Sequence, residues 1–261
     1  MLKALKSKPS KILSRNIDIQ NEKDFHNDIF RDTSKREDSV GKYYILQKAI
    51  LDQFHKEIND LVGKGSAIIE IGCGLDETMF STLNGCQNRY AIDISEVAIE
   101  EQNKKAEGLG VKINYFVMDA HHVNFEDEKF DLVFGTSILH HLNLEKSLPE
   151  FWRILKPAGK LIFIEPLGIN PLIKKFRNKT PELRTVDEKP LDRNDLQLIR
   201  SIFSSVNIIF FDLLTLALPV LFGNHINKRA ISILRKLDSI LFSVLPFTRY
   251  YSWQVLIVAG K

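Results

Sequence analysis

Short apolar segments alternate with stretches of helical periodicity along the first two thirds of the chain. Five segments rich in β-branched and aromatic residues are predicted to be strands: 67–71, 88–95, 111–118, 130–136 and 161–165. Apolar residues at helical spacing predict helices over 43–61, before the first strand, and 95–107, after the second. Because strands alternate with helices, the pattern predicts an α/β fold with a mainly parallel sheet.

Two further helical features are predicted at strand connections. A helix over 77–83 would follow the first strand, and its N-terminus would face a ligand. The Pro157–Gly159 stretch within 156–160 predicts the end of a helix and a turn before the fifth strand.

The last third of the chain is less regular. A helix is predicted over 192–203, and strands over 206–211 and 251–258, with about forty residues between the two strands. We expect a helical insertion over 212–250. Its second helix, 227–245, places five apolar residues on one face: Ile231, Leu234, Leu237, Leu241 and Val244.

The apolar run 206–222 is a weak candidate for a membrane-spanning helix. It contains Asp212 and Pro219 and falls short of the roughly 20 apolar residues that a span needs. The run is therefore predicted to be a strand followed by a helix.

Two glycines follow the first strand at a spacing that points to a ligand. Gly72 and Gly74 predict a tight turn where a backbone can approach a bound molecule closely. The dinucleotide fingerprint needs a third glycine three residues after the second, where this chain has Glu77. An acid at that position would repel a pyrophosphate, so NAD and FAD are disfavoured.

Acidic residues end the strands on either side of this turn. Glu70 stands in the first strand, Asp93 ends the second, and Asp119 follows the third. A carboxylate about twenty residues past the glycines can accept both hydroxyls of a ribose, which is the role predicted for Asp93.

These features resemble the class I S-adenosylmethionine (SAM) methyltransferases over roughly residues 43–211. Their first motif is written E-x-G-x-G-x-G; Glu70, Gly72 and Gly74 match it, and Asp76 replaces the third glycine. The segment 130–142, with its Leu-His-His-Leu ending, resembles the small-molecule, methyltransferase-11/UbiE-like group. The resemblance implies a doubly wound, Rossmann-like, seven-stranded sheet, mainly parallel with strand seven antiparallel, and SAM as cofactor.

The resemblance also implies which residues bind the cofactor. Asp93 would hold the ribose, Asp119 the adenine amino group, and the Ala120 amide a ring nitrogen. A tyrosine before the first strand, Tyr43 or Tyr44, would contact the methionine end. The cofactor-binding residues predicted in this way are Glu70, Gly72, Cys73, Gly74, Asp93, Ile94, Asp119, Ala120, Thr136 and Tyr43.

Acceptor-side residues are expected at the end of the fourth strand and in two flanking segments. His140 and His141, with His26 second to them, are the predicted general bases, since histidine titrates near neutral pH. The polar loop 166–191 would cover the acceptor, and its predicted contacts are Glu165, Arg184, Asp187 and Glu188. Alternatively, these residues only pack a cap helix or form ion pairs within a surface loop.

Composition narrows the function further. A net charge of +3 gives no support for a nucleic-acid partner, and Cys73 and Cys86 form neither a disulfide framework nor a metal-ligand spacing. No metal is predicted, and the thiols favour a cytosol-like compartment. Residues 1–40 are predicted to be a basic tail without a secretory signal, together with an N-terminal cap; 41–261 would be the methyltransferase domain.

The resulting hypothesis is O- or C-methylation of a small, amphipathic or lipid-linked acceptor. The apolar and basic segment 213–245 would suit contact with a membrane surface, which makes the expected location cytoplasmic or peripheral to a membrane. One alternative is a SAM-binding pseudo-enzyme or scaffold that binds a partner through its C-terminal apolar helices. Methylation of RNA or protein is a further alternative, against which the modest net charge counts.

Overall fold

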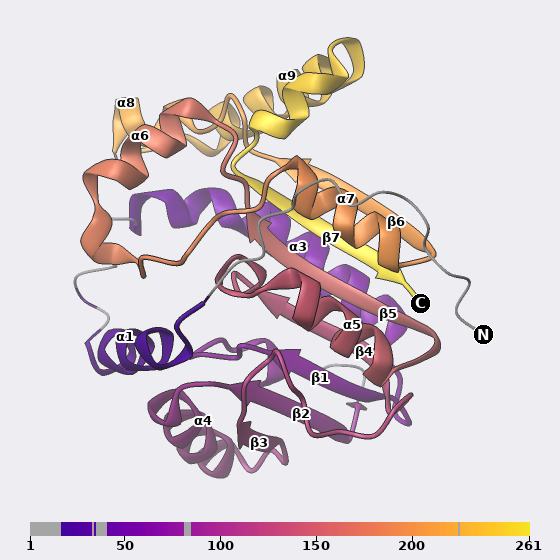
Figure 1. Ribbon diagram of the computed structural model, residues 1–261. Helices are drawn as coiled ribbons and strands as arrows, with labels where there is room; N and C mark the ends of the chain where they lie inside the picture. Colours follow the sequence, from indigo (N-terminus) through magenta and orange to yellow (C-terminus); the bar gives the residue numbers. More distant parts are fainter. Residues whose placement is uncertain (1–16, 33, 35–40, 81–84, 224) are drawn as a thin grey trace.

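The computed structural model describes residues 17–32, 34, 41–80, 85–223 and 225–261, so the predicted basic tail and part of the cap lie outside the described residues. Seven strands form one sheet in the order β3-β2-β1-β4-β5-β7-β6 (Figure 1). Their bounds are β1 Ala67–Ile71, β2 Asn88–Asp93, β3 Asn114–Val117, β4 Phe130–Thr136, β5 Leu155–Pro166, β6 Ser205–Phe211 and β7 Gln254–Gly260. Strand β7 runs antiparallel to both β5 and β6, and the other pairs are parallel. The predicted sheet is confirmed.

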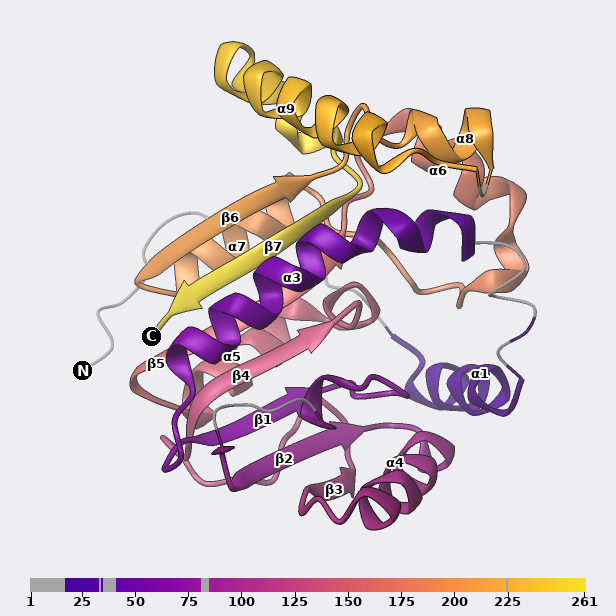
Figure 2. The same cartoon turned by 180° about the vertical axis from the view of Figure 1, so that it is seen from behind.

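Helices cover both faces of the sheet (Figures 1 and 2). On one face α3 (Tyr44–Leu61) and α4 (Glu96–Leu109) pack with Ile68; on the other, α5 (Leu144–Ile154) and α7 (Arg193–Ile202) pack with Ile69. Successive strand residues point to opposite faces, and both faces are buried. This is why the central strands are nearly continuous apolar runs.

Strand order reverses between β1 and β4, which places a crevice at their carboxyl ends. From β1 the chain proceeds to β2 and β3 on one side, then returns to β4 on the other. Ligands of open α/β sheets bind at such a reversal. The Gly72–Gly74 turn leaves β1 at this point.

Some predicted boundaries were wrong. The third strand spans only Asn114–Val117, and the predicted helix 77–83 is a short 3-10 turn, η2 (Thr78–Phe80), with 81–84 outside the described residues. The predicted turn at 156–160 belongs to β5, which begins at Leu155. The turn is accommodated within the strand. The register between β4 and β5 is irregular between Phe130 and Leu132, and Ala158 adopts a left-handed backbone with φ 64°.

The segment predicted as the loop 166–191 contains helices. These are α6 (Pro171–Lys179) and the 3-10 turn η5 (Pro181–Leu183). The Asn170 side chain accepts a hydrogen bond from the Leu172 N–H, and Pro171 occupies the first turn. A proline at that position favours a helix, because the N–H it lacks would have no partner there.

The predicted helical insertion between strands six and seven is present. It contains α8 (Ala217–Phe222), α9 (Lys228–Val244) and the 3-10 turn η6 (Pro246–Tyr251). Before the sheet, the chain forms α1 (Ile19–Arg31) and the 3-10 turn η1 (Gly41–Tyr43), which leads into α3. None of the described helices combines the length and apolar character needed to cross a bilayer.

Candidate active site

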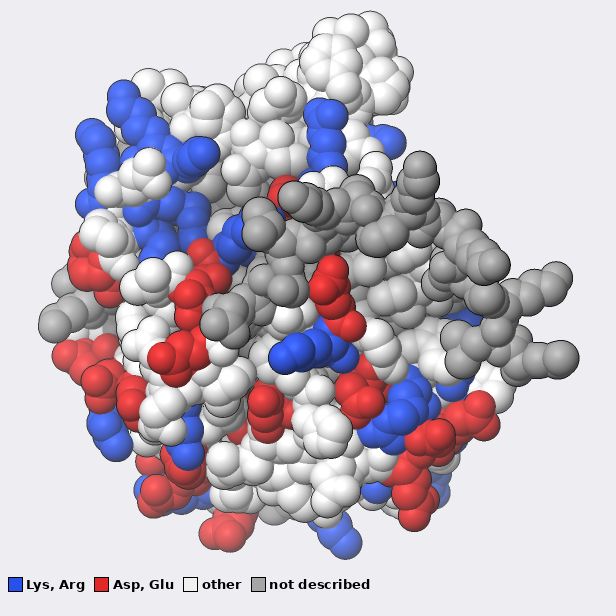
Figure 3. Space-filling model, in the orientation of Figure 1, with Lys and Arg blue, Asp and Glu red and all other residues white. Residues whose placement is uncertain are grey.

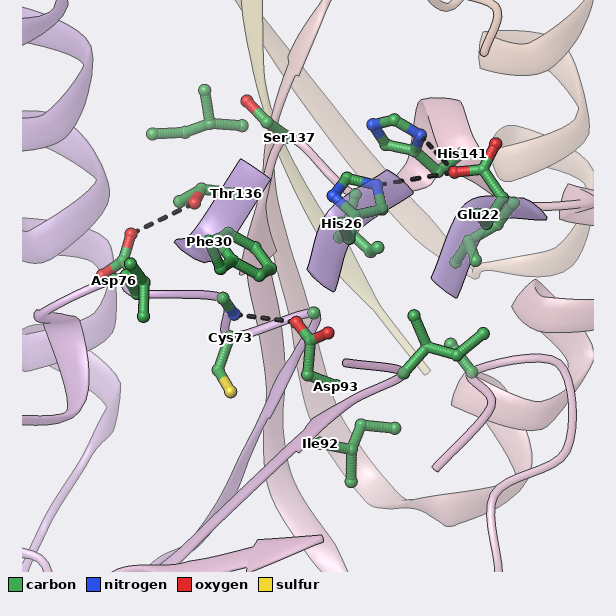
Figure 4. Close-up of a pocket in the computed structure, with 18 of the residues that line it drawn as sticks. Glu22, His26, Phe30, Cys73, Asp76, Ile92, Asp93, Thr136, Ser137 and His141 are labelled. Carbon is green, nitrogen blue, oxygen red and sulfur yellow. Dashed lines mark hydrogen bonds and ion pairs between the residues drawn. The ribbon is translucent and has the colours of Figure 1, made fainter. Parts of the chain in front are cut away.

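A cavity of about 450 Å³ lies at the carboxyl ends of β1, β2 and β4, beneath α1 and beside the first turns of α3 (Figure 4). Gly72, Gly74, Asp93 and Asp119 all line it, together with His26 and His141. Eight of the ten predicted cofactor residues and two of the three predicted bases therefore share one cavity; Glu70 and Tyr43 do not line it. A second described cavity, between α3 and α9, is lined by none of these residues.

The glycine turn is held in a conformation that excludes side chains. Gly72 has φ 65°, and a Cβ there would stand 2.6 Å from the Ile138 side chain. Gly74 has φ 45°, and a Cβ there would stand 3.0 Å from the Phe30 ring. The N–H groups of Gly72 and Cys73 donate to the carbonyl of Ile92. Bare backbone thus faces the cavity, as a close ligand approach requires.

Asp93 is fixed by backbone donors on both sides of the crevice. Its two carboxylate oxygens accept from the N–H groups of Gly74 and Ser95, each at 2.8 Å. Burial raises its pKa, and these two N–H groups oppose the rise. Each carboxylate oxygen has further lone pairs that can accept hydroxyl groups. Ile94, the next residue, also lines the cavity.

Asp119 and Ala120 line the cavity beyond β3, beside His121. The Asp119 Oδ1 atom accepts from the His121 backbone N–H at 2.9 Å and lies 2.7 Å from His121 Nδ1. The His121 Nε2 atom accepts from the Asn143 N–H, so Nδ1 carries the proton. Burial opposes ionisation of Asp119, but its hydrogen bonds with His121 lower its pKa below the ordinary value.

Glu70 lies beneath the turn and does not line the cavity, in contrast to its predicted contact with the cofactor. Its side chain is 1% exposed, and burial, with Asp76 and Asp93 nearby, raises its pKa well above the ordinary value. Thr136 and Cys73 do line the cavity, and the Thr136 hydroxyl donates to Asp76 at 3.2 Å. Asp76, which replaces the family's third glycine, is itself a lining residue.

The far end of the cavity brings together α1 and the 3-10 turn η4 (Leu139–His141) that follows β4. The Oε2 atom of Glu22 lies 3.0 Å from His141 Nδ1 and 3.4 Å from His26 Nε2. All three side chains are largely buried, and the two imidazole rings meet edge to face (Figure 4). Although burial opposes it, hydrogen bonding to His141 and His26 holds the pKa of Glu22 well below its usual range.

These groups could also hold a metal ion. Single ligand atoms of Glu22, His26 and His141 lie within 4.8 Å of one another, as do those of a second set, His140, His141 and Glu188. Two imidazoles and a carboxylate are a donor set that divalent transition metals accept. Spacing along the chain does not indicate the first set as a whole, since His141 is 119 residues from Glu22.

His140 points away from the cavity, which corrects its predicted position at the transfer zone. Its Nδ1 atom lies 2.7 Å from Glu165, and it does not line the cavity. Glu165 is wholly buried and accepts from the backbone N–H groups of Ile138 and Leu139. Burial raises its pKa to about 7. The Glu165–His140 pair thus holds the shape of η4, and Glu165 does not line the cavity.

The other predicted acceptor contacts also lie outside the cavity lining. Glu188 is paired with Arg177 at 2.7 Å, Asp187 accepts from the Asp18 N–H, and Arg184 donates to the carbonyl of Arg177. The alternative of ion pairs within the segment describes Arg184 and Glu188 better, whereas Asp187 contacts Asp18, the residue before α1.

Tyr43 packs against the rings of Phe176 and Trp253, and its neighbour Tyr44 lines the cavity. Several polar and aromatic lining residues were not indicated by the sequence, among them Glu22, Phe30, Ser137 and Gln254. The one available signal was the i, i+4 spacing of Glu22 and His26, which places both on one helix face.

The chain is similar to known methyltransferases in sequence. Residues 69–163 match the family model described as Methyltransferase domain. The uncharacterized methyltransferase YodH of Bacillus subtilis is 31% identical over 105 residues, 40% of this chain and 45% of YodH. The Ubiquinone/menaquinone biosynthesis C-methyltransferase UbiE of Bartonella henselae is 28% identical over 118 residues, 42% of this chain and 45% of UbiE. The chain thus spans about half the length of these relatives.

A solved structure shows the same fold. The geranyl diphosphate C-methyltransferase of Streptomyces coelicolor A3(2), in complex with Mg2+, geranyl diphosphate and S-adenosyl-L-homocysteine, superposes with a TM-score of 0.61 at 16% identity, covering 82% of this chain and 79% of that one. The family match covers β1 through β5, the strands whose carboxyl ends carry the glycine turn and the two aspartates. Residues 69–163 are therefore similar in sequence to the methyltransferase domain family, and the fold agrees with the predicted resemblance to the class I SAM-dependent methyltransferases.

Proposed function

We propose that this protein transfers the methyl group of SAM to a small acceptor bound at the Glu22–His26–His141 end of the cavity. One observation carries the proposal: the glycine turn, Asp93 and Asp119 line the same cavity as two histidines that are hydrogen-bonded to one buried carboxylate.

The cofactor would lie along the carboxyl ends of β1 to β3. Asp93, fixed by two N–H groups, would accept the ribose hydroxyls, and Asp119 with Ala120 would meet the adenine. The methionine part would cross the bare backbone of Gly72–Gly74, with Thr136 and Tyr44 nearby. The sulfonium supplies an activated methyl group, so the protein has to align donor and acceptor and exclude water.

If the acceptor is a hydroxyl group, His141 or His26 would take its proton. When His141 Nδ1 donates its proton to Glu22, the opposite nitrogen is in the form that accepts one. Glu22, ionised because its pKa is lowered, stabilises the imidazolium that would form. A carbon acceptor would use the same site mainly for positioning.

An amphipathic or lipid-linked acceptor fits the mixed lining of the cavity. Ile17, Ile19, Leu51 and Leu142 line it along with the polar groups. The names of several relatives and of one solved structure mention quinone biosynthesis, sterols (the sterol 4-C-methyltransferase strm-1 of Caenorhabditis elegans) and geranyl diphosphate, which are apolar or amphipathic molecules. These names support the acceptor class without naming the acceptor.

The test has two stages. Calorimetric titration with SAM should show binding, in the presence of EDTA as well as without it. Methyl-labelled SAM is then incubated with fractionated lipid and polar extracts, using the wild type and His141→Gln. We expect label in a lipid fraction with the wild type and at least tenfold less with the variant, at unchanged SAM affinity. Absence of SAM binding would refute the proposal.

The scaffold alternative is tested by the same samples. SAM binding without label transfer to any fraction would replace the enzyme proposal with a SAM-binding protein. The exposed apolar side chains of α8 and α9 would then be the region to examine for a partner.

A further inference from the structure

We infer that the end of the molecule formed by α8, α9 and α6 docks on an anionic membrane surface. This end projects from the α/β body, and α8 and α6 lie side by side in both views (Figures 1 and 2). The inference concerns a surface outside the cavity, and only its link to the acceptor rests on the proposed function.

Helix α9 has two apolar faces, of which one is exposed. Ile231 and Leu234 pack inward with Leu46 and Leu218. The outward face carries four apolar residues at helical spacing that are 45–70% exposed: Ile233, Leu237, Ile240 and Val244. The predicted apolar face of α9 is therefore only partly covered: Ile231 packs inward, whereas Leu237 and Val244 are exposed, because the body covers only a narrow stripe of α9.

Neighbouring segments extend this apolar surface. At the tip of α8, Val220, Leu221 and Phe222 are 55–70% exposed, and Leu172 on α6 is 75% exposed. Monomeric proteins scatter exposed apolar residues singly. Here they are concentrated on consecutive turns of two helices, which indicates a surface that is covered in use.

The exposed charges carried by α6, α8 and α9 have one sign, and Asp52 of α3, which lies beside α9, is paired with Lys48. Within residues 205–251 the only acids are Asp212 and Asp238, which are 2% and 3% exposed. Asp212 pairs with Arg235, and Asp238 accepts from the N–H groups of Leu213 and Leu214. The exposed charges that remain are all cationic: Lys228, Arg229 and Lys236 on α9, with Lys174, Lys175 and Lys179 on α6. On the face drawn in Figure 3, this end is mostly white and blue, and red atoms begin at its lower edge.

An anionic bilayer matches both properties. Its headgroups attract the lysines and arginine, and its hydrocarbon receives the aliphatic side chains of a helix lying in the interface. A second copy matches less well, because a two-fold contact would bring the same basic patch against itself. The surface is a projecting helix, which inserts into a bilayer more readily than it fills a protein groove.

Docking here would place the cavity close to the lipid. Helix α3 lines the cavity with Tyr44 and Gln47. Its Leu46 packs on the other side with Ile231, and the Leu46 carbonyl accepts from Arg235 of α9. One helix therefore separates the docking surface from the cavity, which gives a lipid-linked acceptor a short path if the proposed function holds.

Vesicle flotation with the full chain tests the inference. Vesicles of phosphatidylcholine alone are compared with vesicles containing one quarter phosphatidylglycerol, at low and high salt. We expect the wild type to partition at least tenfold more strongly to the anionic vesicles at low salt. Ile233→Ser/Ile240→Ser and Lys228→Glu/Lys236→Glu should each reduce this partitioning about tenfold or more.

Matched controls change exposed residues far from this end. Leu109→Ser on α4 and Lys112→Glu before β3 should bind vesicles like the wild type. SAM affinity measured on every sample verifies folding and separates this test from that of the proposed function. Equal binding to neutral and anionic vesicles, no binding, or a wild-type dimer that the serine variant dissociates in sedimentation would each overturn the inference.

Discussion

The two ends of the cavity are built differently. At the end lined by Gly72, Gly74 and Asp93, the proposed cofactor end, the candidate residues stand within three residues of a strand's carboxyl end. The end formed by Glu22, His26 and His141, the proposed acceptor end, joins residues more than a hundred positions apart. Gly72, Gly74 and Asp93 are linked by hydrogen bonds across neighbouring parallel strands. Glu22 and His26 reach His141 only because α1 packs over the crevice. The first end is part of the sheet, and the second depends on the docking of one helix.

The contacts that hold α1 show how this docking is achieved. The Ser95 hydroxyl donates to Asn27 at 2.6 Å, and Lys23 pairs with Glu96 at the start of α4. Phe30 stands over Gly74. The same helix thus closes the cofactor end and supplies two groups to the acceptor end, so the two ends should respond differently to substitution.

Substitution of Asp93 should have the largest effect. Asp93→Ala removes the carboxylate that accepts from two N–H groups and that we propose to bind the ribose. SAM affinity should therefore fall about 100-fold, or roughly 2.7 kcal/mol, by calorimetry. Asp131→Ala is the matched control, since Asp131 accepts from the Ala67 N–H at the opposite end of β1. The control should bind SAM within about twofold of the wild type; a loss below fivefold for Asp93→Ala would contradict the assignment.

Glu22→Gln should weaken the contacts that Glu22 makes with His26 and His141 and should leave SAM affinity nearly unchanged. At pH 7 the free energy of unfolding in urea should fall by about 1–3 kcal/mol, because a buried charged acceptor for two histidines is lost. The folded-state pKa of Glu22 is lowered, so its contribution is complete above the ordinary value of 4.5 and declines as the pH falls below it.

The difference between wild type and Glu22→Gln should therefore narrow between pH 5 and pH 3. Glu126→Gln, at an exposed position, should leave stability unchanged across the same range. A difference that is constant with pH would mean that the Glu22 charge does not hold α1 in place.

The glycine turn should show the smallest effect. Gly72→Ala and Gly110→Ala both place alanine at a left-handed backbone, φ 65° and 64°, at a cost of about 1–2 kcal/mol each. Only the Cβ at Gly72 meets Ile138, a cavity residue; at Gly110 there is no described atom within 4 Å. SAM affinity should fall about tenfold for Gly72→Ala alone, and equal affinities would show that the turn tolerates a side chain.

Prediction from the sequence succeeded for the strands and for the candidate site residues that stand at their carboxyl ends. Residues 130–136 form a strand as predicted, and Asp93 and Asp119 line one cavity with Gly72. It failed at Tyr43, because side-chain direction turns by about 100° for each helical residue and the transition from η1 to α3 decides which tyrosine faces inward. It also failed at Glu165 and His140, whose pairing depends on how η4 folds back on β5.

The sequence by itself determined the α/β sheet, the order of its elements and the cofactor end of the cavity. Apolar periodicity, glycine turns and strand-end carboxylates act over a few neighbouring residues, so a linear pattern carries them. Only the tertiary structure decided that Glu22 joins His26 and His141, and that the outward face of α9 stays uncovered. Those features depend on where helices dock, and docking is fixed by packing between segments distant in the chain.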